Sequence, residues 1–331
     1  MKEYYPDIHT ILAIKSQEDF HQASLRVFHY QARTNTVYKQ FCELLGTTPD
    51  KVKTTDQIPF LPVELFKTHK VISGMAKPHI VFSSSGTTGQ ATSKHFLPDQ
   101  EVYDHSLNHC FEAIYGPAES YCFLALLPSY LEREGSSLVY MVRQLMKRSG
   151  NPDNGFYLYE HQKLAEKIAN LATTRQQTIL IGVSFALLDF SEKYPISLPD
   201  SFVVMETGGM KGRGREMVRE ELHEILASRF SVPVIHSEYG MTELLSQAYS
   251  KGNGLFRSQP WMKILIRDIN DPFRFLPPGK TGAINIIDLA NIHSCAFIAT
   301  QDLGRVNHDG TFEVLGRYDN SDVRGCNLMV S

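Results

Sequence analysis

A loop of serine, threonine and glycine residues is the part of this sequence whose composition most directly suggests chemistry. It reads Ser83-Ser84-Ser85-Gly86-Thr87-Thr88-Gly89 and follows the apolar stretch Ile80–Phe82. Closely spaced backbone N–H groups and hydroxyls, with little side-chain bulk, can surround a polyphosphate. Lys94 follows and could add a positive charge, although the Lys-Ser/Thr pair of a Walker loop is not at its required position. The same composition is equally typical of a flexible surface turn.

Two later segments place glycines and oxygen-bearing side chains near the ends of predicted strands. Met205-Glu206-Thr207-Gly208-Gly209 ends an apolar strand with two glycines, which would let a planar ring approach the backbone closely. Tyr239-Gly240-Met241-Thr242-Glu243 follows the predicted strand Val232–His236. Taken alone, the first of these segments is better explained as an ordinary turn at the end of a strand.

Five segments together resemble the adenylate-forming superfamily of acyl-CoA synthetases and related ligases, in that superfamily's order. The serine-rich loop with its downstream lysine is similar to the phosphate loop of these enzymes. The other four segments are Met205–Gly209, Tyr239–Glu243, Thr300-Gln301-Asp302-Leu303-Gly304 and Gly316-Arg317-Tyr318-Asp319. In the last two, Gln301 replaces a glycine, and the aspartate of the hinge segment either comes one residue early, at Asp319, or is represented by Asn320. The resemblance implies ATP as the nucleotide and Mg²⁺ as its metal ion.

The resemblance also implies roles for residues near the base and the phosphates. Gly208 and Gly209 would lie along the adenine, and Tyr239 would stack on it. Thr242 would bond to the α-phosphate. Glu243 would hold Mg²⁺ against the phosphates, because a hard cation prefers an oxygen ligand and offsets charge repulsion during attack.

On the ribose side, the same resemblance assigns two residues. Asp302 would accept hydrogen bonds from the ribose hydroxyls. Arg317 would reach the ribose or the α-phosphate. We therefore expect Thr242, Glu243 and Arg317 to act in catalysis, with the serine-rich loop, Lys94, Gly240 and Asp302 binding the nucleotide.

A narrower resemblance links the chain to the LuxE-type acyl-protein synthetases, the fatty-acid-activating components of bacterial bioluminescence reductase complexes. It is carried by Leu127–Leu138, Glu206–Arg213 and the ending Arg324-Gly325-Cys326-Asn327-Leu328. In that family a cysteine near the C-terminus accepts the acyl group as a thioester, and Cys326 is the matching position. A thiolate is a suitable nucleophile, and a nearby Arg324 would lower the thiol pKa. Without the resemblance, a small buried apolar residue would be the better interpretation of Cys326.

The chain stops at Ser331, shortly after the hinge-like segment. We therefore expect that the separate C-terminal lid domain of typical superfamily members is absent, as in the LuxE-type proteins. That lid carries a lysine that stabilises the adenylation transition state. The candidates to replace it are Lys94, Lys211, Arg213 and Arg324.

The elements that would position these residues alternate between strand and helix. We predict strands at Ile80–Phe82, Tyr121–Leu127, Thr178–Val183, Phe202–Glu206 and Val232–His236, and helices at Glu18–Gln31, Thr36–Leu45, Gln100–Ile114, Ser137–Arg148, His161–Thr173 and Arg215–Arg229. Short strands follow at Lys263–Arg267, Gly282–Asp288, Arg305–Val306 and Phe312–Val314, with a hairpin turn at Asn307–Gly310. This pattern predicts an α/β fold with mostly parallel, helix-covered sheets. We expect a body over residues 1–254 and a small β subdomain with a hinge-like tail over residues 255–331.

Composition narrows the class of partner. The 331 residues carry a net charge of −3, 42% hydrophobic residues and no cluster of Lys and Arg, which argues against nucleic acid and anionic membranes as main partners. There is no apolar leader or membrane span, so we expect a cytoplasmic protein. The five scattered cysteines indicate neither a disulfide framework nor a zinc site.

These observations predict ATP-dependent activation of a carboxylic acid, with a fatty acid favoured, followed by transfer to Cys326. A reductase, CoA or an acyl carrier would then receive the acyl group. Two alternatives stay open: an acyl- or aryl-CoA ligase that uses CoA directly, and a non-catalytic nucleotide-binding subunit.

Overall fold

The computed structural model describes residues 6–84, 91–128, 135–208 and 217–318. Their contacts divide the chain into two compact units. Unit 1 combines Met1–Lys77 with Pro260–Ser331, and unit 2 is Pro78–Gln259. The predicted domain division at residues 254 and 255 follows the chain order instead, and it stays a prediction.

Unit 2 is built on a parallel sheet with antiparallel strands at one edge. The strand order is β10-β9-β8-β7-β6-β4-β5, and the strands from β5 to β8 run parallel. The strands are β4 (Cys122–Leu126), β5 (Gly155–Phe156), β6 (Thr178–Val183), β7 (Phe202–Thr207), β8 (His236–Tyr239), β9 (Ala248–Ser250) and β10 (Phe256–Arg257). Strands β4 and β6 are buried along their whole length, as expected for parallel strands with both faces covered.

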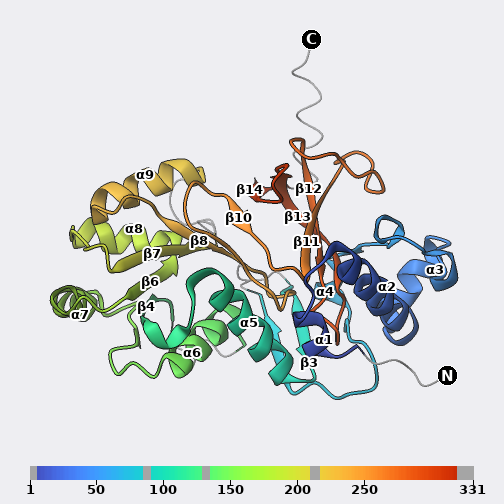
Figure 1. The fold of residues 1–331 in the computed structure, drawn as a ribbon, viewed down its shortest axis with the longest axis horizontal. Coiled ribbons are helices and arrows are strands. Elements are labelled where there is room, and N and C mark those ends of the chain that lie inside the picture. Colours follow the sequence, from blue (N-terminus) through green and yellow to red (C-terminus); the bar gives the residue numbers. More distant parts are fainter. Residues whose placement is uncertain (1–5, 85–90, 129–134, 209–216, 319–331) are drawn as a thin grey trace, which may run out of the picture. The chain divides into compact units, whose positions relative to one another are not determined.

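Helices cover both faces of this sheet. They are α5 (Gln100–Tyr115), α6 (Ser137–Ser149), α7 (His161–Thr174), α8 (Ser184–Lys193) and α9 (Arg219–Phe230). In Figure 1, α8 and α9 lie on one side of the strands, and α5 and α6 lie on the other. The alternation of strands and helices predicted from the sequence is therefore confirmed, and it brings the carboxyl ends of β6, β7 and β8 to one edge of the sheet.

The bounds of two predicted elements in the parallel sheet and its helices need correction, and one helix was missed. Strand β8 begins at His236, whereas the sequence suggested that a strand would end there; Pro233 has no N–H to donate to a sheet. Helix α8 was not predicted, because its apolar residues continue the run of β6 without a break. Helix α9 begins at Arg219 rather than Arg215, which lies outside the described residues.

The predicted strand Ile80–Phe82 forms a separate hairpin rather than part of the parallel sheet. Strand β2 (Ile80–Ser83) pairs antiparallel with β3 (Lys94–Leu97), in a register that sets Ser83 opposite Lys94. The serine-rich loop connects these two strands. Of that loop, the structure describes Ser83 and Ser84; Ser85, Gly86, Thr87, Thr88 and Gly89 lie outside the described residues.

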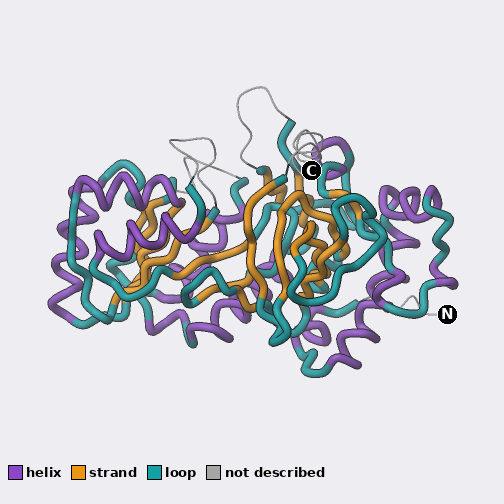
Figure 2. Tube along the Cα trace, turned by 90° about the horizontal axis from the view of Figure 1, so that it is seen from above, coloured by secondary structure: helices purple, strands orange, loops and turns teal. Residues whose placement is uncertain are grey.

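Unit 1 packs N-terminal helices with an antiparallel C-terminal sheet of order β11-β12-β13-β14. The helices are α1 (Ile8–Leu12), α2 (Gln17–Thr34), α3 (Thr36–Leu44) and α4 (Leu65–Thr68). The strands are β1 (Leu61–Pro62), which pairs with β13, and β11 (Met262–Arg267), β12 (Thr281–Asp288), β13 (Phe297–Val306) and β14 (Phe312–Arg317). Figure 2 shows these strands in orange beside the purple helices. The turn at Asn307–Gly310 between β13 and β14 is as predicted, with positive φ at Gly310.

Buried polar side chains join the two ends of the chain within unit 1. Gln31, near the end of α2, donates from Nε2 to the carbonyls of Asn291 and Ile292 and accepts at Oε1 from the amide of Ala296. Asn35 caps α3 by accepting from the amide of Tyr38, and its Nδ2 donates to the carbonyl of Ser294. Such contacts between distant segments explain why the N-terminal helices belong to the same compact unit as the C-terminal strands.

None of the helices in the described ranges is both long and apolar enough to cross a membrane.

Candidate functional site

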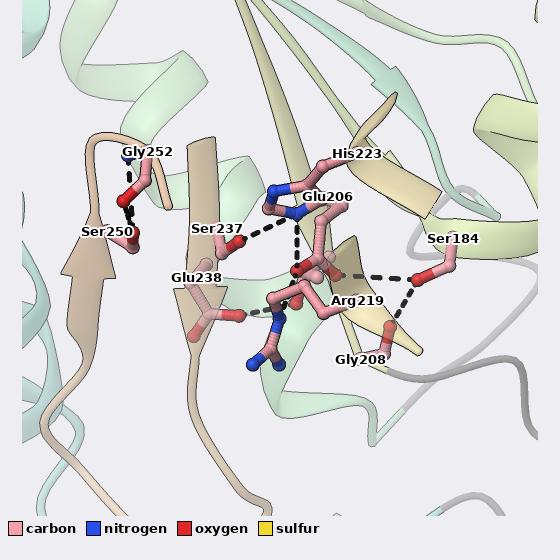
Figure 3. A network of polar contacts seen from close by, with 10 residues as sticks. Ser184, Glu206, Gly208, Arg219, His223, Ser237, Glu238, Ser250 and Gly252 are labelled. Atoms are coloured by element: carbon pink, nitrogen blue, oxygen red, sulfur yellow. Dashed lines mark hydrogen bonds and ion pairs between the residues drawn. The ribbon is translucent and has the colours of Figure 1, made fainter. Parts of the chain in front are cut away.

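A buried carboxylate organises the carboxyl end of β7 in unit 2 (Figure 3). The side chain of Glu206 is only 4% exposed. Its Oε1 atom lies 3.2 Å from Nε of Arg219 and 3.6 Å from Nε2 of His223, both on α9. Because Arg219 and His223 are four residues apart on one helix, they lie on the same face and can both contact the same carboxylate. Glu206 thereby ties the end of β7 to the first turns of α9.

The charge of Glu206 is stabilised in this position. Burial alone would raise the pKa of the carboxyl group. Hydrogen bonding to His223 and Ser237 and the positive charge of Arg219 together outweigh burial, so the pKa lies below its ordinary value. Glu206 is therefore ionised at neutral pH and acts as a fixed negative anchor.

The predicted adenine segment is held by a hydroxyl group from the neighbouring strand. Ser184, the first residue of α8 after β6, donates to the carbonyl oxygen of Gly208 at 2.6 Å and lies 3.4 Å from Oε2 of Glu206. Gly208 has φ of 68°, a left-handed conformation that glycine adopts without steric cost. The orientation of this peptide is thus fixed by Ser184. Gly209 lies outside the described residues.

The aromatic residue predicted to stack on adenine is connected to the same anchor. The ring of Tyr239, at the end of β8, packs edge-on against Phe256 at a centroid distance of 6.0 Å. The guanidinium of Arg219 lies over that Phe256 ring at 5.1 Å. The two segments assigned to the base, at Gly208 and Tyr239, are therefore both supported by Arg219 and its carboxylate partner.

Gly240 has no room for a side chain. The Thr207 hydroxyl donates to the carboxylate of Glu238, and this holds the Glu238 side chain in a buried position. A methyl group at Gly240 would overlap Oε1 of Glu238 and approach Cγ of Gln247. The glycine of the Tyr-Gly-x-Thr-Glu segment is therefore required by packing, in addition to any contact with a nucleotide.

A hydrogen bond joins the β2–β3 hairpin, which carries the predicted phosphate loop, to the segment Tyr239–Glu243. His95 on β3 is fully buried, and its Nδ1 donates to the carbonyl of Thr242 at 2.8 Å. At the base of the loop, Ser84 accepts from the amide of Ser93 at 2.9 Å. Lys94, next to His95, is exposed and opposite Ser83. His95 and Thr242 are thus hydrogen-bonded although they lie 147 residues apart in sequence.

Glu243 fits the chemistry of a Mg²⁺ ligand only if the nucleotide supplies further oxygens. Glu243 is buried, with 5% of its surface exposed. Among the described residues, no group of three or more His, Cys, Asp or Glu side chains could hold a metal ion by itself. Mg²⁺ commonly binds through one or two carboxylates together with phosphate oxygens. A single carboxylate next to Thr242, whose carbonyl accepts from His95, is compatible with that arrangement.

In unit 1, the two segments assigned to the ribose lie side by side. Asp302 on β13 and Arg317 on β14 are register partners, and Nε of Arg317 lies 3.4 Å from Oδ1 of Asp302. Gln301, which replaces a glycine of the superfamily pattern, donates from Nε2 to Glu64 at 2.6 Å. The replacement is therefore accommodated by a local hydrogen bond, and it leaves the Asp302–Arg317 pairing intact.

Several predicted residues cannot be located. Asp319, Arg324 and Cys326 lie outside the described residues, as do Lys211 and Arg213. Conversely, four supporting residues were not predicted from sequence: Ser184, Arg219, His223 and His95. The position of Ser184 directly after an apolar parallel strand is a usable signal, because strand ends of this kind carry ligands in α/β folds. Nothing in the sequence singled out the other three.

No protein-family model matches the sequence, and no curated protein matches it. Solved structures do resemble the fold. For 2-hydroxyisobutyryl-CoA ligase in complex with 2-HIB-AMP and CoA, the TM-score is 0.65 at 12% identity, covering 97% of this chain and 76% of that chain. For ATP-bound MatB from Rhodopseudomonas palustris, the TM-score is 0.54 at 16% identity, and the match covers 72% of this chain.

The luciferase-like enzyme from the nonluminescent Zophobas morio mealworm has a TM-score of 0.53 at 14% identity, with 75% of this chain and 59% of that chain covered. The match spans 47% of the MatB chain, about half its length. These similarities in structure show that the chain has the fold of adenylate-forming enzymes.

Proposed function

We propose that this protein activates a carboxylic acid with ATP. A carboxylate oxygen attacks the α-phosphorus, the bond to the bridging oxygen of the β-phosphate breaks, and pyrophosphate leaves an acyl-adenylate behind. The observation that carries this proposal is the hydrogen bond from His95 to Thr242, because it joins β3, the strand that follows the predicted phosphate loop and carries Lys94, to the residue predicted to contact the α-phosphate. Adenylation depends on positioning and charge stabilisation, and such a connection supplies positioning.

The residues of the site take distinct roles in this proposal. The loop Ser84–Gly89 and Lys94 hold the phosphates, Thr242 contacts the α-phosphate, and Glu243 binds the Mg²⁺ that offsets the phosphate charge. Gly208, Gly209, Tyr239 and Gly240 surround the base, and Asp302 and Arg317 bind the ribose side. Arg317 suits this role, since its side chain is 73% exposed and free to reach beyond Asp302.

We further propose that Cys326 takes the acyl group. Its thiolate sulfur would attack the acyl carbonyl carbon, form a thioester and release AMP, after which a reductase, CoA or carrier protein receives the acyl group. The other four cysteines, Cys42, Cys110, Cys122 and Cys295, are buried. Burial raises the pKa of Cys42 and of Cys122 to about 12, which makes these thiols poor nucleophiles at neutral pH.

Carboxylate-dependent ATP–pyrophosphate exchange tests the first step. We expect exchange with at least one member of a panel of fatty, aryl and amino acids, and loss of exchange in Glu243→Gln. Measurable ATP binding without exchange for any acid would instead support a nucleotide-binding subunit without catalysis.

Mass analysis after reaction with ATP and the active acid tests the second step. We expect one acyl group on Cys326, absent in Cys326→Ala and retained in the control Cys42→Ala. The likeness to a ligase solved with CoA favours one alternative, direct transfer to CoA. If Cys326→Ala forms acyl-CoA at the full rate, that alternative holds and the thioester does not.

A further inference from the structure

A buried arginine in unit 1 has no role in the function proposed above. Arg267 is the last residue of β11 and is 6% exposed. Its Nη1 donates to the carbonyl of Ile284 at 2.8 Å and to Oδ1 of Asn285 at 2.6 Å. Its Nη2 donates to the carbonyl of Thr300 at 2.6 Å and to the hydroxyl of Tyr318 at 2.8 Å. One guanidinium therefore binds β12, β13 and the residue that follows β14.

All four acceptors are uncharged, which makes each of these bonds important. Burying a guanidinium removes its hydration, and the loss must be offset by hydrogen bonds to the protein. Bonds from a charged donor are stronger than neutral ones, and the planar fork of arginine fixes their directions. These bonds therefore fix the position of the Arg267 guanidinium, and the guanidinium fixes the positions of its four acceptors.

Two of these acceptors belong to the segments that carry the proposed ribose residues. Thr300 precedes Asp302 by two residues, and its hydroxyl accepts from the amide of Asp302 at 3.1 Å. Tyr318 directly follows Arg317, and its amide donates to the carbonyl of Gln301 at 3.0 Å. Arg267 thus holds both strands next to the pair formed by Asp302 and Arg317.

The ladder between β13 and β14 is irregular next to this pair. The register shifts between Leu303 and Gly304, one residue beyond Asp302. An irregularity of this kind bends a strand and leaves its local pairing incomplete. A side-chain anchor on the far side of Asp302 compensates for it.

We propose that Arg267 is a positioning residue, which sets the placement of Asp302 and Arg317 through Thr300 and Tyr318 and so contributes to recognition of the ribose hydroxyls of ATP. This inference rests on the proposed function. It assigns no contact between Arg267 and the nucleotide.

Tyr318→Phe is the mildest test, since it removes a single acceptor and leaves the ring. The dissociation constants of ATP and of 2′,3′-dideoxy-ATP are measured by calorimetry. We expect the wild-type protein to prefer ATP, and Tyr318→Phe to weaken ATP binding by about tenfold, the size of one lost hydrogen bond to a charged group. Binding of the dideoxy nucleotide should change much less. The preference for ATP, which is the ratio of the two dissociation constants, therefore falls.

Glu313→Gln is the matched control. It removes an ion pair with Arg305 in the same β13–β14 hairpin, away from Arg267, and should leave the preference unchanged. Arg267→Lys should reduce the preference further, because an ammonium cannot reproduce the four directed bonds. Amide hydrogen exchange at Arg317 and Tyr318 reports the anchoring itself and should accelerate in Tyr318→Phe.

Two failures can be told apart. A wild-type protein without affinity for ATP overturns both the proposed function and this inference. A wild-type preference for ATP that persists unchanged in Tyr318→Phe, even with faster amide exchange, overturns only the inference and leaves Arg267 with a structural role.

Discussion

Neutralising Glu206 should destabilise unit 2 by an amount that its contacts allow us to work out. Removing one partner of a buried ion pair costs about 3–5 kcal/mol, because the other charge is left buried. Here Arg219 is 25% exposed and recovers part of its hydration, and a glutamine retains an oxygen for one hydrogen bond. We therefore expect Glu206→Gln to lower the free energy of unfolding by about 2–3 kcal/mol at pH 7.

Urea unfolding with linear extrapolation measures this difference. The matched control is Glu224→Gln, which removes a carboxylate from an exposed position of α9, the helix that carries Arg219, and should change stability by less than about 0.5 kcal/mol. Equal stabilities of the two variants at pH 7 would refute the role of Glu206 as an anchor.

The pH dependence supplies a second check on Glu206. Its pKa in the folded protein is below the ordinary value of 4.5, so its contribution is present above that value and is lost as the pH falls through the folded pKa. The difference in stability between wild type and Glu206→Gln should therefore narrow below about pH 4.5. A stability difference between wild type and Glu206→Gln that grows as the pH falls would contradict a negative charge on Glu206.

Three further outcomes are expected. Gly240→Ala should cost about 1–3 kcal/mol in urea unfolding, because the added methyl overlaps the Glu238 carboxylate, and an unchanged stability would show that this carboxylate moves freely. Glu243→Gln should reduce the rate of ATP–pyrophosphate exchange by about 100-fold or more, and ATP affinity is measured in parallel. Equal exchange rates in the wild type and in Glu243→Gln would remove Glu243 from the proposed metal site. Burial lowers the pKa of His236, which contacts Tyr115, to about 4. Because protonation then favours the unfolded chain, stability should fall between about pH 6.5 and 4 more steeply in wild type than in His236→Gln; parallel curves would contradict this.

The parts of the fold that sequence predicts well are those with an uninterrupted periodic pattern. Strand β6 has the predicted bounds, and α7 differs by one residue, because a continuous apolar run and a helical period each determine one structure. Helix α8 was missed since no polar turn separates it from β6. The joining of α2 to the C-terminal segment could not be predicted, because Gln31 finds its acceptors about 260 residues away.

The candidate site shows the same contrast. The order of its motifs is visible in the sequence, and the pairing of Asp302 with Arg317 follows once β13 and β14 form a hairpin. Apart from Ser184, the residues that support these motifs could not be inferred, because their roles depend on tertiary neighbours. A buried histidine such as His95 or an arginine such as Arg267 looks like any other in the sequence, until the fold supplies the carbonyls that it contacts.

The joining of α2 and α3 to the C-terminal strands has a practical consequence for dissecting the protein. A cut that follows chain order would leave Nε2 of Gln31 without its two carbonyl acceptors and would remove the Ser294 carbonyl from Asn35. It would also expose the apolar faces of Phe28 and Phe297, whose rings pack 6.2 Å apart. Residues 78–259 are the segment to produce alone. The remainder is better made as one polypeptide, with a linker replacing that segment, so that both ends of unit 1 fold together.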